Sequence, residues 1–307
     1  MEYSYGSFVF NIKFMKYLIL LKENNTFDIP KGGKKDDEKP IDTAIREAKE
    51  ETGLEIKPIP YFSVSYEYEK RHGKKIVTAF LSIVEDENIK ISKEHAGFLW
   101  LSFDELLNDP RTYKNWLEIL PKVNEYLTKF LAIKDLNDQY RMLPEKYEWD
   151  LSRNFVPGEG PLNARYMLIG QAPGREEDIK LRPFVGRSGR LLNKIIEEIG
   201  LKRSDFYITS VVQFFPFNNA VPSKRYIDLC KPFLIDQINI VKPKAIVLLG
   251  NIATTTLLGF DNVLINHGKI VEKDSIAYIV TIHPASALRF KKYYNILKED
   301  LSLIKKF

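Results

Sequence analysis

The segment GGKKDDEKPIDTAIREAKEETGL, residues 32–54, predicts a helix with an acidic face. Asp42 or Thr43 can cap the start of this helix through its side-chain oxygen. Gly53 stands where a left-handed residue commonly ends a helix. We therefore expect a helix over residues 43–52.

Three carboxylates share one face of the expected helix. Glu47, Glu50 and Glu51 stand at positions i, i+3 and i+4, where like charges repel by about 0.2–0.5 kcal/mol per pair. A divalent cation would reverse this penalty, and Mg²⁺ prefers carboxylate oxygens, so the face suits hydrolysis of a phosphoanhydride. The alternative is a solvated acidic helix with Arg46 and Lys49 as partners. We expect the apolar residues of the helix to turn toward the core: Ala44, Ile45 and Ala48.

The spacing of the whole segment resembles the Nudix box. The matching residues are Gly32, Glu38, Arg46, Glu47, Glu50, Glu51, Gly53 and Leu54, with Ala48 where a branched aliphatic residue is usual. The resemblance implies an α/β fold, in which a mixed sheet lies between helices as an α/β/α sandwich. It also implies a hydrolase of nucleoside diphosphates linked to another moiety.

The resemblance further implies a role for each box residue. Glu47, Glu50 and Glu51 would be ligands of Mg²⁺ or Mn²⁺, with Glu50 and Glu51 also counted as catalytic. Gly32 would add its backbone carbonyl as a metal ligand. Arg46 would orient Glu47, and Glu38 would support the loop.

Three further segments are similar to the asymmetric diadenosine-tetraphosphate hydrolases: FDIPKGG (27–33), YEYEKRHGKKIVTAFL (66–81) and ISKEHAGFLWLSFDEL (91–106). The similarity makes Glu94 a candidate base or metal ligand. Lys74 and Lys75 would bind a polyphosphate, although an exposed lysine pair is more often only solvated. The aromatic residue that stacks on a base in that group would fall at Ala79, so a stacking surface worth about 1–3 kcal/mol would be lost.

The length and charge of the chain indicate two domains. It has 307 residues, which is more than a single core usually supports. The run at 120–136 has apolar residues at helical spacing, and a polar stretch without clear period follows it, so we expect domains over 1–135 and 136–307. The first carries a formal charge of −2 and the second +7. The positive charge favours a polyanion such as DNA, with ordinary solubility as the alternative.

The single cysteine excludes an intramolecular disulfide and a cysteine-based zinc site. No apolar run approaches the ~18 residues of a membrane span. We expect a cytoplasmic protein with no membrane partner.

In the second half, apolar runs alternate with helical stretches, which predicts a parallel sheet covered on both faces. Sites in such sheets lie at the carboxyl ends of the strands. GQAPG (170–174), Ser210, Gly250 and His283 fall at these ends. Taken singly, each is a weak signal, because Gly and Pro end strands everywhere and a histidine at a strand end is more often structural.

Seven segments occur together in an order similar to the family 4 uracil-DNA glycosylases. They are PGEGPLNARYMLIGQAPGREED (157–178), RPFVGRSGRLL (182–192), YITSVV (207–212), LCKPFLIDQI (229–238), VKPKAIVLLG (241–250), HGK (267–269) and HPASALR (283–289). The resemblance implies an α/β/α fold that flips a base out of DNA and cleaves its N-glycosidic bond.

The same resemblance assigns the site residues of this half. His283 would donate to the base oxygen as charge develops, and Phe184 would stack on the flipped base. Leu288 and Arg289 would form the wedge that fills the vacated position in the duplex. The backbones of GRSG (186–189) and GQAPG would hold phosphate and water. The residues of the GQAPG loop are Gly170, Gln171, Ala172, Pro173 and Gly174.

The chain departs from that family at the residues that would contact the water and the base, and at the cysteines that would ligate the iron–sulfur cluster. Gln171 replaces a glutamate and can orient a water but cannot take its proton, and Ser210 replaces the asparagine that reads uracil. Of four cluster cysteines only Cys230 remains, so no iron–sulfur cluster is expected. The lost ones fall at Phe214 and near Pro144 and Tyr147. We expect the bulky Phe214 and Tyr147 to fill the volume of the cluster.

The leading hypothesis is a Mg²⁺-dependent Nudix hydrolase of nucleoside polyphosphates fused to a glycosylase-like DNA-repair domain. In one alternative, the second half is a DNA-binding module without catalysis. In another, it excises a base other than uracil, such as a deaminated purine.

Overall fold

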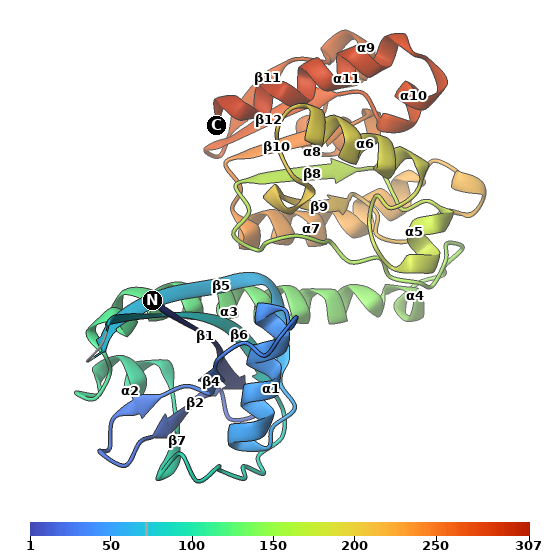
Figure 1. Cartoon of the computed structure of the whole chain (residues 1–307). Helices are drawn as coiled ribbons and strands as arrows, with labels where there is room; N and C mark the ends of the chain where they lie inside the picture. Colours follow the sequence, from blue (N-terminus) through green and yellow to red (C-terminus); the bar gives the residue numbers. More distant parts are fainter. Residues whose placement is uncertain (71–72) are drawn as a thin grey trace. The chain divides into compact units, whose positions relative to one another are not determined.

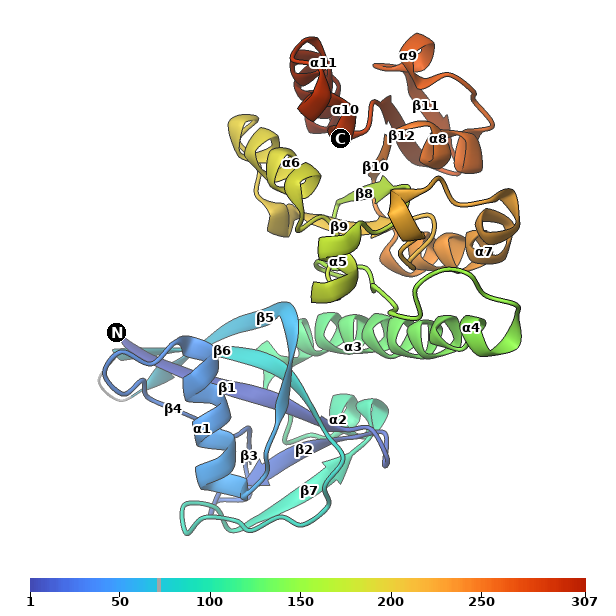
Figure 2. The ribbon, with the colours of Figure 1, turned by 90° about the vertical axis from the view of Figure 1, so that its right-hand side faces the viewer.

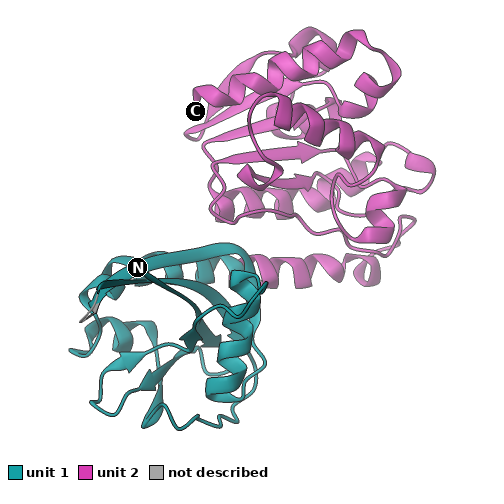
Figure 3. Ribbon diagram, viewed as in Figure 1, with its two compact units in different colours: residues 1–130 teal, residues 131–307 magenta. Residues whose placement is uncertain are grey.

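The computed structural model describes residues 1–70 and 73–307, so Arg71 and His72 of the 66–81 segment lie outside the described residues. The chain divides into two compact units, Met1–Phe130 and Leu131–Phe307 (Figure 3). The division falls within one helix.

That helix, α3 (Lys114–Arg141), is longer than the expected 120–136. The polar residues that follow position 136 continue the helix because Tyr140 lies one turn after Leu136, and both side chains are buried.

Unit 1 is built on a mixed sheet. Its strands run in the order β3-β2-β1-β6-β5, with β4 paired to β1 and β7 paired to β2. β1 and β6 are parallel, whereas the other pairs are antiparallel. The strands are β1 (Glu2–Asn11), β2 (Lys16–Leu21), β3 (Phe27–Asp28), β4 (Lys31–Gly32), β5 (Lys57–Lys70), β6 (Gly73–Val84) and β7 (Gly97–Leu101). The expected mixed sheet is confirmed.

The acidic helix is α1 (Pro40–Thr52), which packs against β1 (Figure 1). It begins about one turn earlier than expected, because Pro40 is well suited to a first helical position. Gly53 ends it in the left-handed conformation at φ +74°. Ala44 and Ala48 face the core as expected, but Ile45 is 36% exposed, so its expected burial was wrong.

The remaining helices of unit 1 are α2 (Phe103–Asn108) and the first part of α3. Trp116 of α3 is fully buried and packs edge-on against Phe8 of β1 at 5.3 Å between ring centroids. This aromatic contact holds α3 against the sheet.

Unit 2 has a sheet in the order β11-β12-β10-β8-β9. The strands are β8 (Tyr166–Gly170), β9 (Phe206–Ser210), β10 (Ala245–Leu249), β11 (Ile270–Lys273) and β12 (Ile276–Thr281). All neighbours are parallel except β11, which is an antiparallel edge strand on β12 that the sequence pattern did not indicate. Its alternation is too short and too exposed to stand out.

Helices cover both faces of this sheet. Figure 2 shows α6 and α11 on one face and α7 and α8 on the other. The helices of unit 2 after α3 are α4 (Leu143–Lys146), α5 (Arg175–Lys180), α6 (Arg187–Glu198), α7 (Lys224–Val241), α8 (Asn251–Leu258), α9 (Val263–Asn266), α10 (Pro284–Arg289) and α11 (Lys292–Ser302). The carboxyl ends of β8, β9, β10 and β12 therefore meet at one edge. Of the helices described, none combines the length and apolar character needed to cross a bilayer.

Candidate active sites

Arg46 lies at the centre of the acidic face of α1. Its guanidinium donates to Glu38 Oε1 at 2.7 Å, to Glu47 Oε1 at 2.6 Å and to Glu50 Oε2 at 3.0 Å. The bond from Arg46 is the main reason why the pKa of Glu38 falls to about 2. The Lys35 ammonium, 3.1 Å from Glu50 Oε1, lowers the pKa of Glu50 together with Arg46. One arginine thus gathers three carboxylates of the box.

Glu51 is the most buried of the three carboxylates Glu47, Glu50 and Glu51. It is 8% exposed, and its Oε2 has no hydrogen-bond partner among the described residues. Burial raises the pKa of Glu51 to about 8. A buried carboxylate oxygen left without a partner is costly unless a ligand satisfies it.

The residues of the box fit a divalent cation by their donor chemistry. A Cβ atom added to Gly32 would collide with the Glu47 carboxylate, so a larger residue in β4 would displace this carboxylate from its position. In residues 1–70 and 73–307, however, no three acidic, histidine or cysteine side chains converge enough to hold a metal ion. The carboxylates repel one another, and each takes a basic partner or is buried.

The loop that carries Glu94 is tied to the end of α1. The Ser92 N–H donates to the Glu51 carbonyl oxygen at 3.0 Å, and the Lys90 N–H donates to the Thr52 carbonyl oxygen at 2.9 Å. Glu94 itself is exposed two residues further on. The backbone therefore brings its loop next to the helix that carries the box.

The two candidate polyphosphate lysines lie in ion pairs. Lys74 Nζ is 2.8 Å from Glu67 Oε1, and Lys75 Nζ is 2.8 Å from Glu2 Oε1. A polyphosphate would have to displace these carboxylates, so the pair is less available than its sequence indicates. Ala79 is fully buried in β6, so this alanine offers no stacking surface to a base.

Sequence reasoning missed a buried charged cluster behind Glu51. Asp28 pairs with Lys31 and also with Lys22, whose Nζ is 3.0 Å from Asp28 Oδ2. Burial opposes ionisation of Asp28, but the two lysines outweigh it and lower the pKa of this carboxyl. Only the motif FDIPKGG could have pointed to the cluster, because a lone buried acid leaves no periodic signal.

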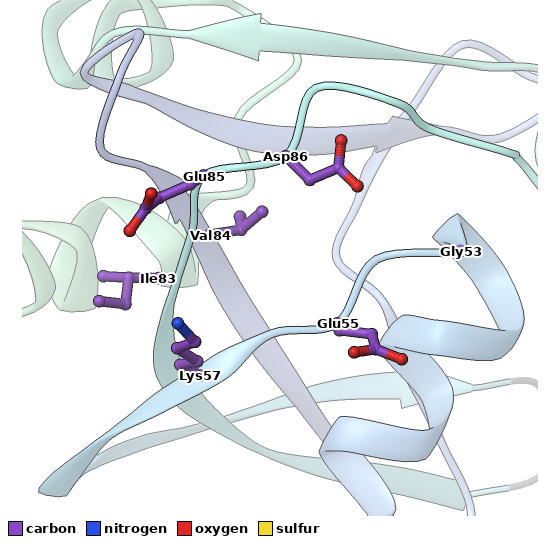
Figure 4. A pocket seen from close by; sticks show the side chains of 7 residues that line it. All are labelled: Gly53, Glu55, Lys57, Ile83, Val84, Glu85 and Asp86. Carbon is purple, nitrogen blue, oxygen red and sulfur yellow. The ribbon is translucent and has the colours of Figure 1, made fainter.

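A cavity of about 470 Å³ lies elsewhere in unit 1 (Figure 4). Its lining residues are Gly53, Glu55, Lys57, Ile83, Val84, Glu85 and Asp86. Three carboxylates against one lysine would repel a polyphosphate, and no predicted site residue lines the cavity.

In unit 2 the structure brings three predicted residues together at the sheet edge. Gly170 and Ser210 are paired in register at the ends of β8 and β9. A Cβ atom added to Gly170 would lie 2.5 Å from Phe184 Cζ and 3.5 Å from Ser210 Oγ. The Phe184 ring therefore lies directly over Gly170 and beside Ser210, where only a glycine leaves room for it.

His283 completes this group. Its ring centroid is 6.0 Å from that of Phe184, and a Cβ atom on Gly250 would lie 3.0 Å from His283 Cβ. His283 Nδ1 accepts the N–H of Ala285 at 3.2 Å, so the proton of the neutral ring is on Nε2. Burial lowers the pKa of His283 to about 4. At neutral pH the ring is an uncharged donor.

The other predicted residues of unit 2 surround this group. Gln171 and Ala172 are partly exposed, Pro173 is buried, and Gly174 caps α5. Leu288, 42% exposed, and Arg289 stand exposed at the far end of α10, the helix that His283 caps. Phe290, 56% exposed, extends this apolar tip and was not singled out from the sequence.

The residues at the positions of the four expected cluster cysteines do not fit an iron–sulfur cluster. Cys230 is buried in hydrogen-bond contact with the Tyr140 hydroxyl, and burial raises the pKa of its thiol to about 12. An aromatic cluster packs in this region, with Phe214 fully buried at its centre. Its members are Tyr140, Trp149, Phe155, Phe214, Tyr226 and Phe233. Tyr147 is 44% exposed, so its expected filling role was wrong, and Trp149 packs on Phe214 instead.

Comparison with known proteins divides the chain in the same way. The model of the NUDIX domain matches residues 5–122, and that of the uracil DNA glycosylase superfamily matches residues 157–302. A type-4 uracil-DNA glycosylase of Sulfurisphaera tokodaii is 40% identical over 168 residues, which cover 51% of this chain and 76% of that protein.

The first half has its own relatives. The asymmetrical bis(5′-nucleosyl)-tetraphosphatase of Mus musculus is 31% identical over 113 residues, covering 31% of this chain and 77% of that protein. A crystal structure of a C. elegans Ap4A hydrolase binary complex matches with 20% identity and a TM-score of 0.39, covering 42% of this chain and 98% of that one.

The chain therefore belongs to two families, the Nudix hydrolases through its first half and the uracil DNA glycosylase superfamily through its second. Both are families of hydrolytic enzymes, and the protein is a hydrolytic enzyme with a DNA-repair domain.

Proposed function

We propose that unit 2 flips a base out of DNA and cleaves its N-glycosidic bond. The observation that carries the proposal is the grouping of Phe184, Ser210 and a neutral His283 at one sheet edge. A ring to stack on, a polar group at the base edge and an uncharged N–H donor are what base excision requires.

The reaction can be written from these residues. As the bond between C1′ and the base breaks, negative charge grows on the base, and His283 Nε2–H donates to its carbonyl oxygen. Gln171 orients the water that adds to the sugar carbon, and the proton of that water goes to the departing base anion because glutamine cannot accept it. Leu288 and Arg289 fill the duplex position that the base leaves.

Uracil is the first candidate base. The Ser210 hydroxyl both donates and accepts but lacks the fixed donor–acceptor pair of an amide, which weakens discrimination by about 1–3 kcal/mol. This replacement favours a deaminated purine as the second candidate. Gln171 in place of an acid, together with the +7 charge, favours a DNA-binding module as the third.

A panel of lesion oligonucleotides tests the proposal. Each duplex carries uracil, hypoxanthine or xanthine, and strand cleavage after alkaline treatment reports excision. We expect excision of at least one base, a loss of about 10²–10³-fold in His283→Ala, and no loss in His267→Ala, a histidine that pairs with Asp300 outside the site. DNA binding with a steep salt dependence but without excision of any base would contradict the proposal and favour the DNA-binding module.

We further propose that unit 1 hydrolyses a nucleoside polyphosphate, with diadenosine tetraphosphate as the first candidate. The supporting observation is the buried Glu51 Oε2, which has no hydrogen-bond partner within residues 1–70 and 73–307, together with the contact between Gly32 and Glu47. Gly32, Glu47, Glu50 and Glu51 would hold Mg²⁺ or Mn²⁺. When bound, the metal would neutralise phosphate oxygens and supply an activated water.

The residues around the box have their own tasks in this proposal. Arg46 keeps Glu47 and Glu50 near each other, Glu38 fixes Arg46, and Glu94 is the candidate base. Diadenosine tetraphosphate incubated with Mg²⁺ should yield mononucleotides on chromatography. Glu50→Gln should lose at least about 100-fold in rate, and the control Glu55→Gln, which pairs with Lys49 outside the box, should not. Absence of products, or an unaffected Glu50→Gln, would contradict the proposal.

A further inference from the structure

Phe184 has a backbone conformation that phenylalanine rarely adopts. Its φ is +50°, in the left-handed region where the Cβ atom of a non-glycine residue crowds the backbone. Such a conformation persists only where the surroundings over-determine it. The contacts of the neighbouring peptide groups therefore decide where the Phe184 ring stands.

On one side of Phe184, a buried carboxylate accepts hydrogen bonds from the N–H groups of the next two residues. Glu177 of α5 is 8% exposed, and its Oε1 accepts from Val185 N at 2.9 Å and from Gly186 N at 2.7 Å. Its Oε2 accepts from Gly174 N at 3.1 Å. One side chain thus joins the end of the GQAPG loop to the residues after Phe184 by charge-assisted bonds.

Glycine at two of these positions makes the approach possible. A Cβ atom would lie 2.7 Å from Glu177 Oε2 at Gly174 and 3.0 Å from Glu177 Oε1 at Gly186. The φ angles are −90° at Gly174 and −76° at Gly186, values that any residue adopts, so the need is for space and not for conformation. The sequence spaces GQAPG, Glu177 and GRSG so that the carboxylate fits between the two loops.

On the other side, a guanidinium donates hydrogen bonds to the carbonyl groups of Phe184 and of the residue before it. Arg203 Nη2 donates to the Pro183 carbonyl oxygen at 2.7 Å, and Nη1 donates to the Phe184 carbonyl oxygen at 3.3 Å. Arg203 Nε in turn donates to Glu159 Oε1 at 3.2 Å. A planar fork with several donors can hold two carbonyls and a carboxylate at once, which a lysine cannot.

We propose that Glu177 and Arg203 are positioning residues that fix the Phe184 ring as the stacking platform for a flipped base. The inference rests on the proposed glycosylase activity of unit 2. The carboxylate holds the N–H groups after Phe184, and the guanidinium holds the carbonyls of Phe184 and the residue before it. Together they keep φ positive and the ring over Gly170.

A double-mutant cycle with single-turnover kinetics tests this role. Glu177→Gln keeps the shape of the side chain but turns an amide N–H₂ toward one of the backbone donors. We expect a loss of about 10–100-fold in the excision rate, because small misplacements of a binding surface have effects of this size. Affinity for DNA should stay within about threefold because phosphate contacts dominate it.

In the Phe184→Ala background, Glu177→Gln should cost nothing further, since the residue acts through the ring. Arg203→Lys should behave in the same way. Glu197→Gln, which removes an exposed charge on α6, is the control and should be unchanged. Equal losses in both backgrounds, or an unaffected Glu177→Gln, would overturn the role.

Amide hydrogen exchange separates this inference from the proposed function. If the wild type excises no base from any lesion duplex, the glycosylase proposal fails. The positioning contacts are then read directly: Glu177→Gln should speed exchange at Gly174, Val185 or Gly186, and Glu197→Gln should not. Unchanged exchange at all three amides would overturn the inference by itself.

Discussion

The acidic helix α1 and the sheet edge around His283 reach their arrangements by different routes. On α1, the carboxylates of Glu47 and Glu50 are held by Arg46, while Glu51 is buried and its Oε2 has no partner in the part of the chain that the structure describes. At the sheet edge, a neutral ring and close backbone contacts hold Phe184 and His283 in place. Carboxylates that carry the same charge stay close together only when an opposite charge offsets their repulsion. Neutral rings and backbone groups do not repel one another, so folding alone brings them to their positions.

Metal removal should give the largest difference in activity between the two sites. With excess EDTA, nucleotide hydrolysis by unit 1 should fall to background and return on adding Mg²⁺, because the carboxylates of the box supply no activated water without a metal. Base excision by unit 2 should continue at the same rate in the same buffer. Loss of both activities, or persistence of hydrolysis, would contradict the contrast between the two sites.

The neutral ring of His283 should make unit 2 sensitive to acid. Because the folded state holds the pKa of His283 near 4 and the unfolded chain near 6.5, the unfolded state binds more protons between these values. The free energy of unfolding should therefore fall as pH falls through this window, by up to roughly 3 kcal/mol.

Urea unfolding at pH 7 and pH 4.5, compared between the wild type and His283→Asn, measures this contribution. The difference between the two proteins should shrink as the pH falls, because asparagine does not titrate. A difference that is independent of pH would argue against a buried neutral ring.

Alanine substitutions at two adjacent glycines test whether the contact between Gly32 and Glu47 matters for hydrolysis. Gly32→Ala should reduce nucleotide hydrolysis by about 10–100-fold, the cost of disturbing the surroundings of a metal ligand, because the new Cβ collides with the Glu47 carboxylate. Gly33→Ala meets nothing within 4 Å and should keep its activity. Steady-state kinetics over a range of Mg²⁺ concentrations would detect the difference, and equal behaviour of the two variants would refute it.

The smallest effect is expected away from both sites. Tyr140→Phe removes the hydroxyl that contacts Cys230 but keeps the ring that stacks on Phe233 at 4.4 Å. The free energy of unfolding should fall by about 1 kcal/mol, the usual contribution of a hydrogen bond, with base excision unchanged. A loss of several kcal/mol would mean that the contacts of the hydroxyl with Cys230 and with the Val211 carbonyl oxygen, and not the aromatic packing, hold this region.

Local patterns predicted most of the fold because they depend on neighbours along the chain. The apolar runs of unit 2 became β8, β9, β10 and β12, since a buried parallel strand needs a continuous run of apolar residues. The same reasoning missed β11, which is short and half exposed. It also ended α3 too early, because Tyr140 is the one buried residue in the polar run 137–141.

The sites were only partly predictable. Spacing identified Glu47, Glu50 and Glu51, but identical residues at i, i+3 and i+4 do not reveal which one turns inward. Glu177 and Arg203 carried no signal of their own, because their role depends on backbone groups in loops distant along the chain.

The sequence by itself determined the two families, the acidic helix and the apolar runs that became the parallel strands of unit 2, because these follow from residue types at fixed spacing. Only the tertiary structure decided that Glu51 is buried, that the Phe184 ring lies over Gly170 and that the His283 ring stands beside it. It also decided that Trp149 and not Tyr147 packs on Phe214. The reason is physical: burial, exposure and contact depend on segments far apart in the chain, and no local pattern encodes which of them will meet.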